Sequence, residues 1–179
     1  MSSAARAYVG MGSNLGDRAG NLLLALRGMA GAGLAPARLS GVYETEPAGV
    51  FEEQPAFLNM VAELRAPLPA PPELLRLLLD IELTLGRTRP RPLAPRTLDL
   101  DLLLYGSSVI DADTLTLPHP RLHQRRFVLA PLAELIPDSR HPTLNSTFAQ
   151  LLDATPERPY VRLWAPNRMA DGGLKTTDL

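Results

Sequence analysis

Alternation and helical spacing of the hydrophobic residues divide the chain into a regular series of elements. Four short apolar stretches have the character of β-strands: residues 6–12, 39–43, 57–64 and 98–105. Two runs, residues 22–29 and 74–85, carry apolar side chains at helical spacing, and glycines follow both runs where helices commonly end. The pattern therefore predicts the order strand, helix, strand, strand, helix, strand.

This order matches the ferredoxin-like βαββαβ arrangement, in which helices cover one face of an antiparallel sheet, so we expect an α+β fold. Beyond this core, residues 126–135 are expected to form a helix, 148–152 a short helical turn, and 160–164 a late strand that lengthens the sheet. We expect one domain over residues 1–166. Residues 167–179 are polar and contain glycine, so a flexible tail is predicted there.

Composition indicates a globular protein with almost no net charge and therefore no strong overall electrostatic field. The chain has 179 residues, of which 45% are hydrophobic and 21% are charged, and 18 Lys and Arg nearly balance 19 Asp and Glu. No global charge favours nucleic acid or an anionic membrane, so any electrostatic function must be local. The absence of cysteine excludes disulfides, thiolate metal sites and cysteine nucleophiles. Without a long apolar segment, the protein is expected to be cytoplasmic.

Two aspartates in the strand 98–105 are the first candidates for chemistry. Side chains alternate along a strand, so Asp99 and Asp101 share one face while the leucines between them share the other. Two carboxylates this close repel each other and call for a cation. Magnesium prefers oxygen ligands and commonly binds one or two carboxylates together with substrate phosphates. The alternative is that both aspartates pair with nearby arginines on a solvated strand edge.

A basic segment precedes this strand. Its arginines lie within ten residues, with no acidic residue between them: Arg87, Arg89, Arg91 and Arg96. Guanidinium groups match phosphate oxygens in geometry and stay charged in any environment. Prolines interrupt regular structure here, which favours a mobile phosphate clamp beside the aspartates. A solvated basic loop that pairs with Glu82 and the two aspartates is the other interpretation.

Several short motifs occur in a fixed order along the chain. The segment 95–101 reads Pro-Arg-Thr-Leu-Asp-Leu-Asp, and further motifs occupy residues 12–16, 43–47, 54–59 and 117–121. In these motifs the chain resembles the 6-hydroxymethyl-7,8-dihydropterin pyrophosphokinases of folate synthesis, from about residue 8 to residue 135. The resemblance implies that the β,γ-diphosphate of ATP passes to the hydroxymethyl group of the pterin and that AMP is released. It also implies Mg²⁺, as two ions, with ATP as co-substrate.

The resemblance assigns expected roles to individual residues. Those implied in catalysis are Arg89, Arg96, Asp99 and Asp101, the two aspartates also being the metal ligands. Those implied in nucleotide binding are Glu82, Arg87, Leu102, Thr116, His119 and Arg125, with Glu82 orienting an arginine or contacting ATP. Those implied in the pterin pocket are Thr45, Ala48, Phe57, Asn59 and Phe127, the two phenylalanines facing opposite sides of the ring.

The chain departs from the family pattern at several positions, and two other functions stay open. Leu93 and Ala94 stand where an aromatic residue and a glycine are expected, and Pro120 replaces an expected aromatic residue. One alternative is a nucleotide- or pterin-binding module that has lost turnover. Another is a subunit that acts beside other folate-pathway enzymes through its tail. The expected partners are ATP and the pterin, without nucleic acid or membrane, and the expected state is a monomer.

Overall fold

The structure is a computed structural model that describes residues 6–47, 54–87 and 94–164. Its main sheet has the strand order β5-β1-β4-β3-β8, with β2 also paired to β4, and every pairing is antiparallel. The strands are β1 (Arg6–Ser13), β2 (Pro36–Leu39), β3 (Tyr43–Thr45), β4 (Phe57–Arg65), β5 (Asp99–Tyr105) and β8 (Val161–Leu163). The predicted ferredoxin-like α+β fold is confirmed, including the late strand that lengthens the sheet.

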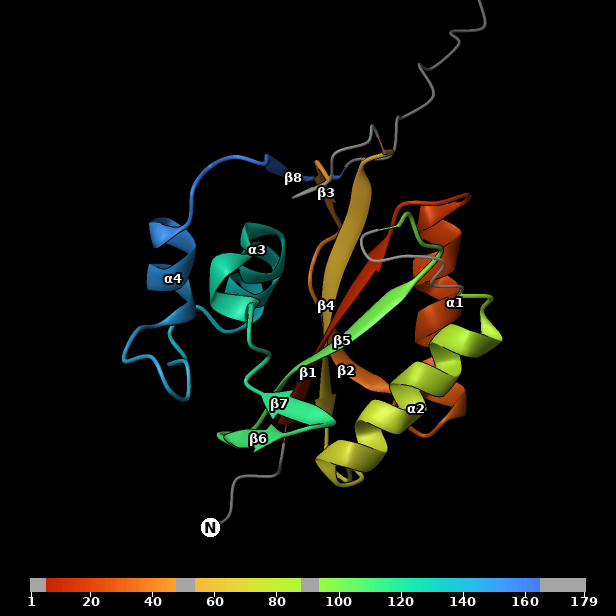
Figure 1. Ribbon diagram of the computed structural model, residues 1–179, viewed down its shortest axis with the longest axis horizontal. Helices are drawn as coiled ribbons and strands as arrows, with labels where there is room; N and C mark the ends of the chain where they lie inside the picture. Colours follow the sequence, from red (N-terminus) through yellow and green to blue (C-terminus); the bar gives the residue numbers. More distant parts are fainter. Residues whose placement is uncertain (1–5, 48–53, 88–93, 165–179) are drawn as a thin grey trace, which may run out of the picture.

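Helices cover both faces of this sheet (Figure 1). On one face lie α1 (Arg18–Gly31) and α2 (Pro71–Thr84), and on the other lie α3 (Arg126–Leu135) and α4 (Phe148–Ala154). Two separate clusters of buried side chains account for this: Val9 packs with residues of α1 and α2, whereas Val61 packs with residues of α3. The expectation of helices on one face therefore holds for the two core helices, and α3 and α4 add a layer on the other.

The two core helices end where the sequence pattern places their stops. Asp17 caps α1, because its Oδ1 accepts a hydrogen bond of 2.9 Å from the amide of Gly20. Two prolines begin α2, and their missing N–H groups cost nothing there, because the first N–H groups of a helix have no partner within it. Gly86 follows α2 at a φ of +79°, a left-handed conformation that glycine adopts without steric cost.

The predicted strand 39–43 is wrong in its extent, because β2 ends at its first residue and β3 begins at its last. Between them the amide of Ser40 donates to the carbonyl of Val61, and the Ser40 hydroxyl accepts from the Val61 amide. The next amide, that of Gly41, donates to the carboxylate of Glu134 in α3 at 3.0 Å. A hydroxyl and a carboxylate thus take the place of some ladder bonds, and β2 and β3 are separate strands that both pair with β4.

Glu134 fixes α3 against the sheet. Its carboxylate also accepts a hydrogen bond of 2.9 Å from the hydroxyl of Tyr43 in β3. Burial and then this bond raise the pKa of Tyr43 to about 12, so the phenol remains a donor throughout the physiological range. Phe127 lies in the first turn of α3, so the contact between Glu134 and Tyr43 also fixes the Phe127 ring relative to β3.

Three shorter elements lie between β5 and α3. The hairpin of β6 (Ile110–Ala112) and β7 (Leu115–Leu117) and the 3₁₀ turn η1 (Leu122–Gln124) were not predicted, since elements of three residues carry no periodicity. Within the described ranges, no helix is long and apolar enough to cross a membrane. The predicted tail, 167–179, lies outside the described residues.

Candidate active site

A cavity of about 820 Å³ lies on the face of the sheet that α3 covers. It collects side chains from β1, β3, β4, β5 and the start of α3. The predicted site residues that line it are Thr45, Phe57, Asn59, Arg87, Arg96, Asp99, Asp101, Arg125 and Phe127. The fold thus brings together residues that are up to about eighty positions apart in the sequence.

The two aspartates of β5 point into this cavity, as the alternation predicts. The leucines between and beside them are buried in the core on the opposite face. On the neighbouring strand, Gly12 lies opposite Asp99 and Gly10 lies opposite Asp101. A glycine at these two positions places no side chain beside the carboxylates, which leaves them open to the cavity.

Arginines pair with both aspartates. Asp99 receives Arg87 Nη2 at 2.6 Å on one oxygen and Arg96 Nη1 at 2.9 Å on the other. Arg125 Nη1 lies 3.6 Å from Asp101 Oδ2. The aspartates therefore do pair with nearby arginines. The pairs lie inside a cavity, where the side chains of Asp99 and Asp101 are only 22% and 34% exposed. A solvated strand edge does not describe this arrangement.

Asp101 is held in an unfavourable electrostatic position. Burial, followed by repulsion from Asp99, raises the pKa of its carboxyl group, against the attraction of His119 and Arg125. A cation between the two carboxylates would relieve both effects. Among the residues that the structure describes, no group of three or more His, Cys, Asp or Glu side chains comes together. Two carboxylates alone suit magnesium, whose other positions are commonly filled by phosphate oxygens and water.

A buried ion pair supports the arginines from behind. Glu82, in α2, accepts a hydrogen bond of 2.5 Å from the amide of Leu100 and pairs with Arg87. The side chains of Glu82 and Arg87 are only 3% and 5% exposed. Burial raises the pKa of Glu82 above its usual value, and the Leu100 amide and Arg87 offset only part of this effect. Since Arg87 also binds Asp99, α2 determines the orientation of that carboxylate through one arginine.

Two aromatic rings and a polar pair form the other end of the cavity. The guanidinium of Arg96 lies 5.7 Å from the ring centre of Phe57, and that of Arg125 lies 5.5 Å from the ring centre of Phe127. Asn59 Nδ2 donates to Thr45 Oγ1 at 2.8 Å, and both side chains are buried. Rings that flank placed polar groups suit a flat heteroaromatic ligand.

The remaining predicted site residues do not line the cavity or are not described. Leu102 is buried in the core on the far face, so only its backbone could meet a nucleotide. Thr116 pairs with Asp111 in the β6–β7 hairpin. His119 is half-buried and its amide donates to the carbonyl of Leu103 at 2.9 Å. Burial lowers the pKa of His119, against the pull of Asp101. Ala48 and Arg89 lie outside the described residues.

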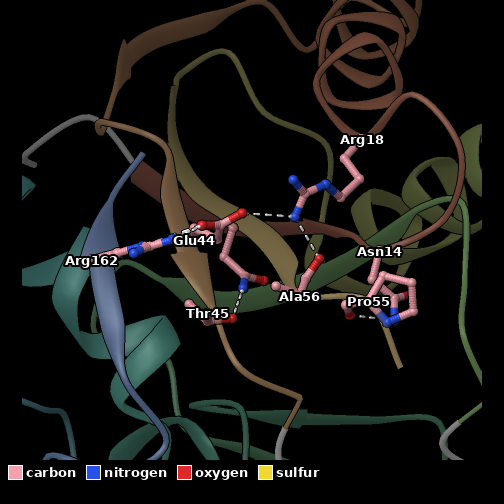
Figure 2. A network of polar contacts seen from close by, with 8 residues as sticks. Asn14, Arg18, Glu44, Thr45, Pro55, Ala56 and Arg162 are labelled. Atoms are coloured by element: carbon pink, nitrogen blue, oxygen red, sulfur yellow. Dashed lines mark hydrogen bonds and ion pairs between the residues drawn. The ribbon is translucent and has the colours of Figure 1, made fainter. Parts of the chain in front are cut away.

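Asn14, within the motif at residues 12–16, supports the site, although it was not among the predicted site residues. Its side chain is almost fully buried. Its Oδ1 accepts from the amide of Arg96 at 2.8 Å. Its Nδ2 donates to the carbonyl of Pro55 at 3.3 Å (Figure 2). The residue thereby joins the end of β1 to the two segments that lead into Asp99 and Phe57. An asparagine beside glycines signals a turn in the sequence, and nothing local identifies these distant partners.

Replacing Asn14 by alanine is expected to lower the free energy of unfolding by about 2 kcal/mol, because the amide of Arg96 loses its acceptor in a buried place. Urea denaturation measures the change. Asn145→Ala is the matched control, since Asn145 is exposed and bonds the exposed Arg140. Equal losses in the two variants would contradict a special role for the Asn14 contacts.

Sequence comparison relates the chain to a family of kinases. Residues 8–137 match the family of 7,8-dihydro-6-hydroxymethylpterin-pyrophosphokinases, HPPK. A Bacillus subtilis (strain 168) protein, 2-amino-4-hydroxy-6-hydroxymethyldihydropteridine pyrophosphokinase, is 46% identical over 130 residues, covering 72% of this chain and 77% of that protein. A Synechocystis protein of the same name is 43% identical over 148 residues, covering 82% of this chain and 74% of that protein.

Structural comparison agrees on the fold. A crystal structure of HPPK-DHPS in complex with substrates has a TM-score of 0.65 at 13% identity, over 84% of this chain and 42% of that chain. Plasmodium falciparum HPPK-DHPS with pterin and p-hydroxybenzoate has a TM-score of 0.67 at 15% identity, over 84% of this chain and 44% of that chain. This chain spans less than half of both solved chains.

Proposed function

Because the chain belongs to the 7,8-dihydro-6-hydroxymethylpterin-pyrophosphokinase family, we propose that its cavity transfers the β,γ-diphosphate of ATP to the hydroxymethyl group of 6-hydroxymethyl-7,8-dihydropterin, with release of AMP. The observation that carries the proposal is the position of Asp99 and Asp101, side by side in a cavity that also holds arginines and two aromatic rings. This combination suits a phosphate-rich nucleotide at one end and a flat heteroaromatic ring at the other.

The pterin is oriented by the aromatic end of the cavity. Phe57 and Phe127 face the two sides of its ring, and Asn59, held by Thr45, hydrogen-bonds its polar edge. Gly12 makes room for that asparagine, because a Cβ atom there would lie 2.8 Å from Asn59 Oδ1. In this pose the hydroxymethyl group points toward the aspartates. Ala48 belongs to the same pocket in this proposal.

The phosphates of ATP bind at the arginine end. Arg87 and Arg96 line the cavity, and the side chain of Arg96 is 24% exposed, so its guanidinium can meet phosphate oxygens. Arg125 adds a third guanidinium, and we assign His119 and Arg89 to the same phosphates. The substrate hydroxyl oxygen attacks the β-phosphorus in line and gives up its proton to solvent. The bond between the β-phosphorus and the AMP oxygen breaks, and the arginines neutralise charge on the transferred group.

Asp99 and Asp101 hold magnesium, as two ions, in this proposal. When bound, magnesium screens the phosphate oxygens and lowers the repulsion between them and the attacking oxygen. Both carboxylates would hold the ions, and Glu82 keeps Asp99 in place through Arg87. No covalent intermediate with the protein is needed, because positioning and charge neutralisation supply the catalysis.

The reaction is tested by incubating the protein with ATP, Mg²⁺ and 6-hydroxymethyl-7,8-dihydropterin and separating the nucleotides. We expect AMP to form only when all three are present, whereas transfer of the γ-phosphoryl group would release ADP. Absence of AMP at saturating substrate would overturn the proposal. Calorimetric binding of ATP and pterin without product would instead favour the binding module that has lost turnover.

The active unit is proposed to be a monomer, because one chain supplies the aspartates, the arginines and both rings of the cavity. Sedimentation during turnover measures this directly. Activity that appears only in a dimer fraction would contradict it and would favour a subunit that depends on a partner.

A further inference from the structure

A single carboxylate behind the pterin end of the cavity joins segments from both ends of the chain (Figure 2). Arg162, in β8, donates to Glu44 Oε2 from Nη2 at 2.5 Å and from Nε at 3.2 Å. Arg18, at the start of α1, donates to Glu44 Oε1 at 3.1 Å. Both carboxylate oxygens of Glu44 are thereby engaged. The Arg162 bond and then the Arg18 bond lower the pKa of Glu44, so the carboxylate stays charged at neutral pH.

Arg18 makes a second contact that gives this cluster its geometry. The same Nη1 atom donates to the carbonyl of Ala56 at 2.7 Å. Glu44 directly precedes Thr45, and Ala56 directly precedes Phe57, and these two following residues are cross-strand partners in the β3–β4 register. One nitrogen of Arg18 therefore joins the residues that lead into two walls of the pterin pocket.

The contacts act on Thr45 through the backbone. Adjacent residues of a strand point to opposite faces, so Glu44 faces away from the cavity when Thr45 faces Asn59. The strand β3 has only three residues, and it is held between β4 and β8. Its position depends on both neighbours, because three residues form few ladder bonds of their own.

The strand β8 extends the site beyond the segment that the family match covers. That match ends at residue 137, whereas Arg162 and the residues before β8 lie later in the chain. Thr155, Pro156, Arg158 and Pro159 line the cavity. Glu46, just after β3, accepts from the amide of Tyr160 at 3.1 Å and lies 3.6 Å from Arg158 Nη1. The C-terminal segment thus forms a wall of the same cavity.

We propose that Arg18, Glu44 and Arg162 form a positioning cluster that holds Thr45 and Phe57 at the separation required to bind the pterin ring, which makes β8 part of substrate recognition. The inference rests on the proposed function. The cluster touches no substrate. We expect it to act mainly on pterin binding, because Asp99 and Asp101, which face the nucleotide, lie on β5, and Arg125 lies between η1 and α3.

Glu44→Ala tests the cluster. We expect it to weaken binding of 6-hydroxymethyl-7,8-dihydropterin about tenfold by calorimetry, because charged hydrogen bonds from two arginines are lost. Affinity for a non-hydrolysable ATP analogue should stay within about twofold, and kcat at saturating pterin should change less than KM. Glu73→Ala is the matched control, since Glu73 pairs with Arg76 on the exposed side of α2 and lines no part of the cavity.

A second variant tests the part played by β8. Arg162→Ala should weaken pterin binding in the same selective way, and it should add little in a Glu44→Ala background, because the two residues act as a pair. A fall in thermal stability with unchanged pterin affinity overturns the proposal, as do equal losses of pterin and ATP affinity. If the variants give either of these results while the wild-type protein turns over normally, only this inference is overturned. Failure of the wild type to bind pterin overturns both.

Discussion

Replacing Asp101 by asparagine is expected to reduce kcat by about a thousandfold or more and to leave the protein at least as stable as before. Asparagine has nearly the same shape but carries no charge, so the site loses half of its paired carboxylates. In the proposed mechanism Asp101 would help to hold the magnesium that neutralises phosphate charge, so the loss of this carboxylate should lower the rate strongly.

Stability should respond in the opposite direction. The pKa of Asp101 is raised in the folded protein, first by burial and then by Asp99. A raised carboxyl pKa means that the charged form is less favourable in the folded state than in the unfolded state, so this carboxylate opposes folding above its unfolded pKa. Removing the charge relieves that cost at neutral pH. The lost contact with Arg125 is long, at 3.6 Å, and offsets little of the gain.

AMP formation and thermal unfolding measure the two effects in one preparation. Asp111→Asn serves as the control, because Asp111 is an exposed aspartate in β6, away from the cavity. It should change neither rate nor melting temperature. A near-normal rate for Asp101→Asn would refute the assignment of this carboxylate to the metal. A large fall in melting temperature would instead show that the carboxylate holds the fold together.

Replacing Glu82 by alanine is expected to produce the largest loss of stability, about 3–5 kcal/mol. The change leaves the buried guanidinium of Arg87 with Asp99 as its remaining ion-pair partner in the described part of the chain. It also removes the acceptor of the Leu100 amide, which lies on β5 at the end of the sheet. A buried charge then keeps only one of these two partners, and a buried donor loses its acceptor.

Graded substitution separates these two contributions. Glu82→Gln keeps an acceptor for the Leu100 amide and removes only the charge, so its loss of unfolding free energy in urea should be smaller than that of Glu82→Ala. Glu73→Ala, on the exposed side of the same helix, should leave the urea midpoint nearly unchanged. If Glu82→Ala and Glu82→Gln were equally destabilised, the Leu100 hydrogen bond would contribute nothing.

Local patterns predicted much of this protein. The positions of α1, α2 and α3, the pairing of Asp99 and Asp101 on one face, and the glycine that follows α2 all depend on residues close in sequence. Their spacing is imposed by the helical and extended backbone itself. The split between β2 and β3 could not be predicted in this way. It depends on Glu134, more than ninety residues later, which binds the amide of Gly41.

The sequence by itself therefore determined the order of the elements, the ferredoxin-like topology and the shared face of the two aspartates, because periodicity and chain direction act locally. Only the tertiary structure decided that Arg87 is buried between Glu82 and Asp99 and that Arg18 and Arg162 meet at Glu44. Such contacts join residues from separate strands and helices, and their geometry follows from how the layers pack. The sequence of one strand was thus enough to identify the candidate aspartates, whereas the arginine and glutamate contacts that orient the site form only in the folded chain.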